Sequence, residues 1–232
     1  MTELHPSLHR SQIAFGGFCL SLNAGYINTA LLSIFEVPVS HMTGATTRLG
    51  IDLVQKQLDD LFLIASILVA FLFGAFLSGL LIDSRKLKPT NHYGTALILE
   101  GLLLLAASEV INSRSVGNGI GVVLAAMACG MQNAMASTYY GLVLRTTHVT
   151  GIITDIGILL SRVVKGQRIL PWKIWILVVL FFGFLTSCIL YGLMTEALSE
   201  WRIRAPALIF VFIGSAYFLS HRKNRNVAFD SR

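Results

Sequence analysis

Residues 39–50, VSHMTGATTRLG, form a polar interruption in a strongly apolar chain. A near-copy, TTHVTGIITDIG, lies at residues 146–157. Five residues of the first stretch recur in the second at the same spacing: His41, Thr43, Gly44, Thr47 and Gly50 correspond to His148, Thr150, Gly151, Thr154 and Gly157. This ordered match indicates that the chain contains an internal repeat.

The composition is typical of a helical membrane protein. Hydrophobic residues make up 54% of the 232 residues and charged residues only 13%, whereas a soluble domain carries about 25% charged residues. Mean hydropathy is +0.70, and several stretches reach the roughly 20 apolar residues that a helix needs to cross a bilayer. The sequence predicts an all-α membrane protein with six transmembrane helices, at residues 12–36, 60–83, 92–112, 117–142, 172–195 and 203–220.

The repeat divides these helices into two equal halves. Each His-x-Thr-Gly segment follows a span, and Gly25 and Asn28 of the first span correspond to Gly130 and Asn133 of the fourth. Two further spans follow each copy, so each half would cross the membrane three times. An odd number of crossings inverts the second half relative to the first, as in many transporters. We therefore predict one integral membrane domain over residues 1–232, with repeats at 12–112 and 117–220 and polar tails at 1–11 and 221–232.

Each copy of the motif predicts a short broken or re-entrant helix, at residues 43–57 and 150–164. Pro38 should end the preceding span, because proline lacks an N–H and disfavours helix at the residue before it. Ser40 or Thr43 is expected to cap the helix that follows. The unsatisfied N–H groups of such a helix start favour anions or electron-rich groups.

These two helix starts predict a substrate-binding site near the membrane midplane, where inverted repeats meet. The histidines would serve as hydrogen-bond donors or proton carriers, and the asparagines would supply amide contacts. The residues predicted to bind substrate are Asn28, His41, Thr43, Gly44, Asn133, His148, Thr150 and Gly151. Threonine and glycine at this spacing also pack and cap helices where there is no site, so both interpretations stay open.

Three charged residues are candidates for a proton or charge relay: Glu100, Arg48 and Asp155. Glu100 lies in the middle of a predicted span, where an acid is costly and is usually functional or paired. Its expected partner is Arg48 or a histidine. Arg48 and Asp155 occupy equivalent positions in the two copies and would pair with each other or with Asp52.

Charge and motif content narrow the functional class. Thirteen of the 18 lysine and arginine residues fall on the side of the predicted termini, which the positive-inside rule places in the cytoplasm. The net charge of +6 therefore reflects membrane orientation, and we expect no nucleic-acid partner. The sequence contains no zinc-protease, Walker A or Ser-His-Asp motif, and Cys19, Cys129 and Cys188 show no metal-binding or redox spacing. We expect no enzyme activity, no metal and no cofactor.

AGYINTALL at residues 24–32, followed by VSHMTGATTRLG, resembles the YoaK family of bacterial inner-membrane proteins. A Gly-Tyr-x-Asp/Asn stretch followed by a His-Met-Thr-Gly-Asn-like motif is typical of that family. In this chain Ala45 stands where the family often has asparagine, and Asn28 stands where an acid is common. The resemblance implies a six-span protein of the bacterial inner (plasma) membrane and supplies no substrate.

The leading functional hypothesis is a small-solute transporter or channel whose midplane site accepts a small anion or a polar metabolite. Two alternatives stay open: a non-transporting module that binds lipid or a partner membrane protein, and an intramembrane enzyme acting on a lipid or quinone. The enzyme would require His41, His148 and Glu100 to converge. Composition predicts the lipid bilayer as a partner, and assembly into a homo-oligomer is left open.

Overall fold

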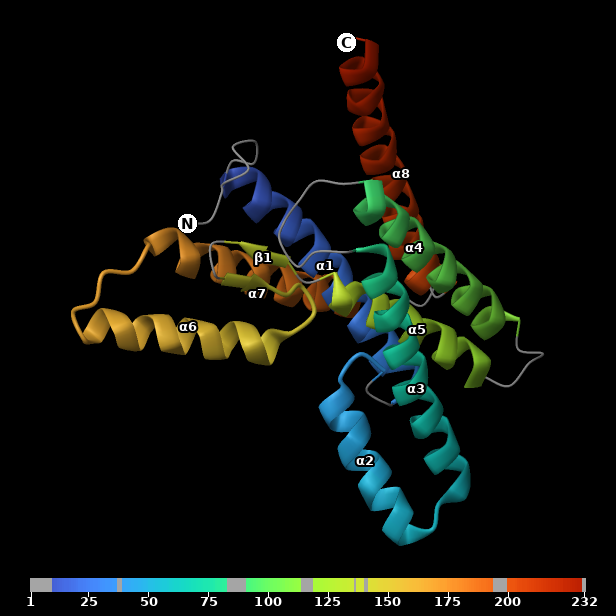
Figure 1. Cartoon of the computed structure of the whole chain (residues 1–232). Coiled ribbons are helices and arrows are strands. Elements are labelled where there is room, and N and C mark those ends of the chain that lie inside the picture. Colours follow the sequence, from blue (N-terminus) through green and yellow to red (C-terminus); the bar gives the residue numbers. More distant parts are fainter. Residues whose placement is uncertain are drawn as a thin grey trace. The chain divides into compact units, whose positions relative to one another are not determined.

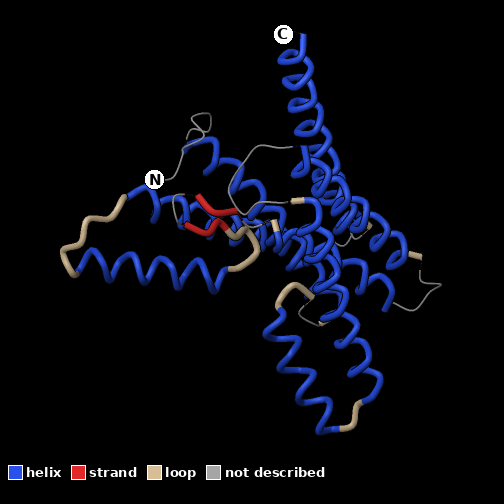
Figure 2. Tube along the Cα trace, viewed as in Figure 1, coloured by secondary structure: helices blue, strands red, loops and turns tan. Residues whose placement is uncertain are grey.

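A computed structural model describes residues 10–36, 39–82, 91–113, 119–135, 137–139, 142–193 and 200–230. Eight helices and one short β-hairpin account for most of the described chain (Figures 1 and 2). The helices are α1 (Arg10–Phe35), α2 (Met42–Gln55), α3 (Leu58–Leu81), α4 (Asn91–Asn112), α5 (Gly119–Ala134), α6 (Val149–Val164), α7 (Pro171–Gly192) and α8 (Trp201–Asp230). The hairpin pairs β1 (Ser137–Tyr139) with β2 (Leu142–Leu144) in antiparallel register.

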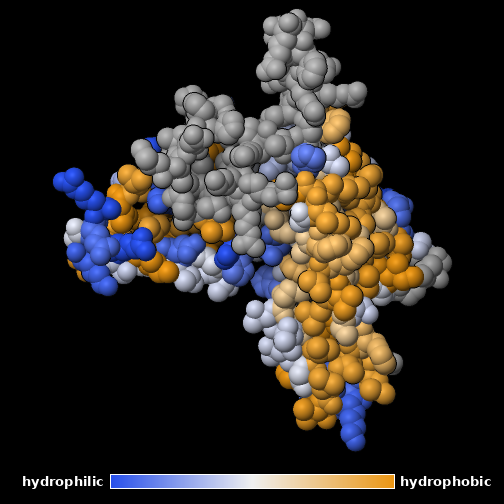
Figure 3. All heavy atoms as spheres, viewed as in Figure 1, coloured by the Kyte–Doolittle hydropathy of each residue, from blue (hydrophilic) through white to orange (hydrophobic). Residues whose placement is uncertain are grey.

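The helical membrane architecture predicted from composition is confirmed. Among the described residues, five helices are long and apolar enough to cross a bilayer, namely α1, α3, α4, α7 and α8. Exposed apolar side chains cover α3, including Leu72, Phe73, Phe76 and Leu80, and they form a continuous apolar column in the space-filling view (Figure 3). Apolar side chains left exposed at this density suit contact with lipid rather than water.

The fourth predicted span differs from the structure. A helix was expected over residues 117–142, but α5 ends at Ala134 and has 16 residues, which corresponds to about 24 Å of helix. The chain then forms the β-hairpin, whose residues Ser-Thr-Tyr and Leu-Val-Leu include β-branched and aromatic types that favour extended backbone. Hydropathy averaged over residues 117–142 is dominated by the apolar helix, so it did not reveal that the helix ends at Ala134, before the less apolar Ser-Thr-Tyr of β1.

The chain forms two compact units. The first contains the described residues up to Tyr26 and those from 137 to 193, and so includes most of α1, the hairpin, α6 and α7. The second contains the end of α1 together with α2, α3, α4, α5 and α8.

In the first unit, α1 and α7 pack in parallel. Gly17 meets Leu180, and Gly25, further along α1, meets Phe184, further along α7. Residues of α1, α6 and α7 together form a buried core in this unit. It consists of Ile13, Ala14, Ile152, Leu159, Ile176, Leu177 and Leu180. Both helices therefore begin at the same end of this unit.

In the second unit, α3 and α5 also pack in parallel. Gly119 near the start of α5 meets Leu63 near the start of α3, and Gly130 meets Phe71. The backbones touch at this crossing, since a Cβ placed on Gly74 or Gly130 would overlap a main-chain carbonyl of the other helix. Only glycine permits such an approach, as at other close helix crossings in membranes.

The α4–α8 pair completes the second unit and runs antiparallel. Gly94 near the start of α4 meets Gly214 late in α8, while Glu109 near the end of α4 holds Arg204 near the start of α8. That ion pair is bidentate, with both N–O distances at 2.8 Å. Because α5 packs antiparallel to α4, with Gly121 at its start against Ile111 at the end of α4, α5 and α8 run in the same direction.

The glycine crossing between α3 and α5 yields a direct test. We expect Gly74→Ala and Gly130→Ala each to lower the free energy of unfolding by about 1–3 kcal/mol, because the added methyl forces apart two touching backbones. Gly79→Ala is the matched control, since it lies on α3 and a Cβ there meets nothing within 4 Å. Thermal unfolding in detergent measures the three variants. Equal melting temperatures for Gly74→Ala and Gly79→Ala would contradict this packing.

Candidate functional site

The two His-x-Thr-Gly segments start their helices in the same way. His41 and His148 are the N-cap residues of α2 and α6, and both have a φ of −111°, with ψ of 86° and 74°. In each helix the first backbone bond returns to the histidine carbonyl at 3.1 Å. In each, the second threonine hydroxyl donates to the carbonyl of the first threonine at 2.9 Å, from Thr47 to Thr43 and from Thr154 to Thr150. The short helices predicted at residues 43–57 and 150–164 are therefore confirmed.

The two helices also bury equivalent positions. Ala45 and Ile152, four residues after the respective histidines, are buried, and so are Asp52 and Leu159, seven residues later. The histidines and the threonines of the motif are exposed within their own units in both helices. Each helix thus presents the same polar face and packs the same opposite face.

The expected capping of α2 was wrong, because neither Ser40 nor Thr43 caps this helix. Thr43 lies inside the first turn, and the N-cap residue His41 makes no side-chain capping bond. The Ser40 hydroxyl instead donates to Oδ1 of Asn28 in α1. Asn28 therefore ties the end of α1 to the segment that leads into α2, which is a structural role for a residue predicted to contact substrate. Asn133 is half-buried near the end of α5.

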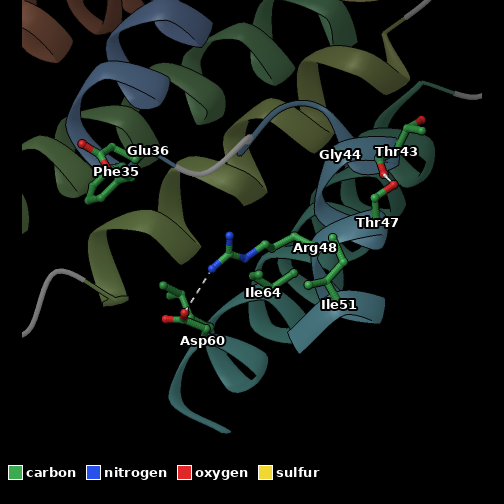
Figure 4. A pocket seen from close by; sticks show the side chains of 10 residues that line it. Phe35, Glu36, Thr43, Gly44, Thr47, Arg48, Ile51, Asp60 and Ile64 are labelled. Atoms are coloured by element: carbon green, nitrogen blue, oxygen red, sulfur yellow. Dashed lines mark hydrogen bonds and ion pairs between the residues drawn. The ribbon is translucent and has the colours of Figure 1, made fainter. Parts of the chain in front are cut away.

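A cavity opens where the end of α1 meets α2 and the start of α3 (Figure 4). Its volume is about 640 Å³, within the range of small-molecule sites. It is lined by Phe35, Glu36, Thr43, Gly44, Thr47, Arg48, Ile51, Asp60, Leu63 and Ile64. Three of the predicted site residues, Thr43, Gly44 and Arg48, thus come together in one cavity.

Arg48 is the centre of an ion-pair network at this cavity. Its Nε lies 3.0 and 3.2 Å from the two carboxylate oxygens of Asp52, one turn further along α2. One terminal nitrogen lies 3.4 Å from Oδ2 of Asp60 on α3, so the side chain bridges the two helices (Figure 4). Asp52 is fully buried, whereas the Arg48 side chain is 51% exposed. The guanidinium therefore covers a buried carboxylate and keeps one side open to the cavity.

Acids outnumber bases at this site. Glu36 and Asp60 line the cavity together with Arg48, and Asp52 lies beneath the guanidinium. Sequence reasoning offered Asp52 as one of two partners for Arg48, the other being Asp155, and it missed Glu36 and Asp60. Glu36 is marked by a left-handed backbone, with φ of +56°, just after the end of α1, and Asp60 by its place in the first turn of an apolar helix. In the second copy of the motif, Asp155 and Leu159 replace Arg48 and Asp52, so this network has no counterpart there.

The histidines do not line the cavity. His41 is exposed at the start of α2 and is not among the lining residues. In the first unit, the His148 ring folds back over its own helix, because a Cβ on Gly151 would lie 2.5 Å from Nδ1 of that ring. The same nitrogen lies 3.3 Å from an Arg145 nitrogen. Gly151 therefore makes room for the His148 ring, and Thr150 stays exposed beside it.

Glu100 lies elsewhere in the second unit, on α4, and is 1% exposed. Its neighbour Gly101 packs against Ala207 and Val211 of α8, and Cys129 of α5 lies within electrostatic reach of the carboxyl group. Among the described residues, Oε2 of Glu100 has no hydrogen-bond partner. The expected pairing with Arg48 was wrong, because Arg48 pairs with Asp52 and Asp60.

The network can be tested by a double-mutant cycle. Arg48→Gln should destabilise the protein by about 1–3 kcal/mol, because it leaves the buried Asp52 carboxylate without its partner. Arg48→Gln combined with Asp52→Leu should recover most of that loss, since leucine occupies the equivalent buried position, Leu159, in the second copy. Thermal unfolding in detergent measures these two variants and Asp52→Leu alone. Additive losses in the double variant would contradict a coupled pair.

A comparison with protein families shows which family the chain belongs to. The model of a family of proteins of unknown function, DUF1275, matches residues 16–216. No curated protein and no solved structure matches the chain. The matched region extends from α1 into α8 and includes both His-x-Thr-Gly helices and the cavity. The chain is therefore a membrane-embedded helical protein that belongs to the DUF1275 family, of which YoaK is a member.

Proposed function

We propose that this protein is a transporter for a small polar solute and that the cavity beside α2 binds that solute. The observation that carries the proposal is the cavity itself, which gathers hydroxyl groups, a guanidinium and two carboxylates inside a membrane-embedded bundle. Polar groups are costly at such places, and their presence usually marks a solute or ion pathway. The exposed N–H groups and hydroxyls at the start of α2 add hydrogen-bonding partners for a ligand.

The proposed transporter consists of two inverted repeats, α1–α4 and α5–α8. The short helices α2 and α6 have 14 and 16 residues, about 21 and 24 Å, whereas a bilayer core measures about 30 Å. Since α5 and α8 run in the same direction in the second unit, the chain between them must make one net crossing. The long helix α7 supplies that crossing, and α6 then returns to the side from which it started. Each repeat crosses three times under this scheme, which supports inversion.

Equivalent helix pairs give further support. The first helix of each repeat packs in parallel against the third helix of the other, as α1 with α7 and α5 with α3. Gly25 and Gly130, which correspond in the repeat, both lie at these crossings. The distribution of lysine and arginine supports a bacterial inner-membrane protein with both termini in the cytoplasm.

The charge of the cavity favours a cationic solute. Sequence reasoning favoured a small anion or a polar metabolite, and the anion was expected because a helix start attracts negative charge. The two lining acids and the buried Asp52 outweigh the single Arg48, so an anion would meet net repulsion and an amine or guanidine would meet attraction. Asp60 is 53% exposed and lies 3.4 Å from Arg48, and Glu36 is exposed as well, so both carboxylates are open to an incoming cation.

Glu100 is proposed as the proton relay of the transporter. It is buried in the second unit among α4, α5 and α8, and an acid at such a depth is held there at a cost that function explains. Proton binding and release at this carboxyl would couple solute movement to the proton gradient. Glutamine at this position would keep the shape of the side chain, but its neutral amide cannot bind and release the proton.

The solute site is tested by uptake into proteoliposomes with matched panels of amines, amino acids and carboxylates. We expect wild-type protein to take up a member of the amine panel, and Asp60→Asn and Thr47→Val to weaken its apparent affinity by roughly 5–10-fold, the value of one hydrogen bond or exposed ion pair. Thr46→Val is the control, since Thr46 lies on α2 but does not line the cavity. Uptake of carboxylates alone, or equal effects of Thr46→Val and Thr47→Val, would contradict the site.

The relay is tested separately with Glu100→Gln. We expect this variant to retain solute binding and to lose stimulation of uptake by an imposed proton gradient, because the amide cannot exchange a proton. Uptake is compared with and without the gradient, and Glu109→Gln, on the same helix but exposed, serves as the control. A Glu100→Gln variant that keeps the full response to the proton gradient would contradict the relay proposal. It would not affect the proposal for the solute site.

A further inference from the structure

The Arg48 side chain makes two contacts of unequal strength at the cavity beside α2. Its Nε lies 3.0 Å from Oδ1 of Asp52, whose side chain is fully buried on the same helix. Its Nη2 lies 3.4 Å from Oδ2 of Asp60 on α3, and there the two side chains are 51% and 53% exposed. Charge-assisted bonds between nitrogen and carboxylate oxygen usually measure about 2.7–2.9 Å. The contact with Asp60 is therefore long as well as exposed.

The contact with Asp52 holds one end of the guanidinium in place. A buried carboxylate that loses its partner costs far more free energy than an exposed ion pair that opens. Nε therefore stays with Asp52, while Nη2 is free to leave Asp60. Arg48 and Asp52 lie one turn apart on α2, whereas the contact with Asp60 links α2 to α3 (Figure 4).

An incoming cation and the Arg48 guanidinium compete for the Asp60 carboxylate. Arg48 is the one base among the residues that line the cavity, and its Nη2 already lies against Oδ2 of Asp60. Two cations on one carboxylate repel each other, whereas an exchange leaves the charge around Asp60 unchanged. A solute cation therefore binds best where it replaces Nη2.

The apolar part of the cavity wall suits a cation that carries a short apolar tail. Ile51, Leu63 and Ile64 line the same cavity as Arg48 and Asp60, and Figure 4 shows Ile51 and Ile64 beside Arg48. Each methylene group that such residues remove from water favours binding. A primary amine with a short alkyl chain presents a compact charge to the carboxylate and apolar surface to these side chains.

We infer that Arg48 is a tethered cation that occupies the solute's binding position on Asp60, and that a primary amine with a short apolar tail binds by displacing Nη2. This inference rests on the proposed function of the cavity. Displacement breaks the Arg48 link between α2 and α3 and leaves the Arg48–Asp52 pair within α2 intact. Binding is thereby coupled to the loss of an interhelical contact, and a ligand shifts a conformational equilibrium only through such a difference in contacts.

Binding of radiolabelled butylamine to the full chain in detergent tests the exchange. Arg48→Gln/Asp52→Leu removes the competing guanidinium and leaves the net charge of the protein unchanged. We expect this variant to bind butylamine roughly fivefold more tightly than wild-type protein does, the upper value of an exposed ion pair. Adding Asp60→Asn should abolish the gain. Arg204→Gln/Glu109→Gln is the matched control, because it removes an ion pair between α4 and α8 of the same unit and should leave the affinity unchanged.

The loss of the link is measured with spin labels at Thr46→Cys on α2 and Val69→Cys on α3, in a background without the native cysteines. Both positions are exposed, and neither lines the cavity. Saturating butylamine should shift the distance distribution between the labels. The shifted distribution should match the one that Arg48→Gln/Asp52→Leu gives without butylamine.

Weaker or unchanged affinity for butylamine in Arg48→Gln/Asp52→Leu would overturn the inference, because Arg48 would then support binding or take no part in it. A label distance that butylamine leaves unchanged would also overturn it, and this measurement needs no substitution at Arg48 if the double variant does not fold. Wild-type protein that binds no butylamine would overturn the inference as well. The proposed function is judged separately, since it fails only if no member of the amine panel is taken up.

Discussion

The arrangement of the chain depends on where its helices break. A backbone in hydrocarbon must satisfy its hydrogen bonds internally, so a non-helical segment is tolerated only where protein buries it or a polar cavity solvates it. Before α2, the Ser40 hydroxyl donates to the side chain of Asn28 in α1, and the first turns of α2 line the cavity. The break before α6 starts its helix with the same backbone geometry. Both breaks are followed by helices shorter than a bilayer core.

The longer helices are held by close backbone approach more than by side-chain bulk. Gly74 and Gly130 let α3 and α5 touch, and Gly94 and Gly214 do the same for α4 and α8. In a lipid environment the hydrophobic effect contributes little between helices, so packing at short distance supplies the attraction. The Arg204–Glu109 pair adds a directional contact at the ends of α4 and α8. Of the two helices that begin with the repeated motif, α2 carries the Arg48–Asp52 ion pair, whereas α6 has Asp155 and Leu159 at these positions.

The two copies of the motif share their local structure but differ in the charged residues that they carry. The two motif helices share their N-cap geometry, their internal threonine bonds and their buried positions. Yet Asp52 in one copy corresponds to Leu159 in the other, and Arg48 corresponds to Asp155. The Arg48–Asp52 pair therefore belongs to one copy of the repeat, and Arg48 lines the cavity of the second unit. Because the motif recurs without these charges, its repetition alone did not reveal which residues line the cavity.

Much of the architecture was predictable from the sequence, and the site only in part. Hydropathy located α1, α3, α4, α7 and α8, and the repeated motif located α2 and α6. The i,i+4 spacing of Arg48 and Asp52 placed both on one face of a helix, so that pair was also predictable. Asp60 and Glu36 could not be found this way, because their place at the cavity depends on how α1, α2 and α3 meet in space. The end of α5 at Ala134 was missed because the apolar residues of α5 dominate the mean hydropathy of residues 117–142.

In the proposed arrangement, α2 and α6 enter the membrane from opposite sides. Single cysteines at Gln57, after α2, and at Gln167, after α6, test it in a background lacking Cys19, Cys129 and Cys188; both positions are exposed. Labelling of intact cells with a membrane-impermeant maleimide should modify Gln57→Cys. The same reagent should modify Gln167→Cys only after permeabilisation. Labelling of both positions from one side would contradict the inverted arrangement.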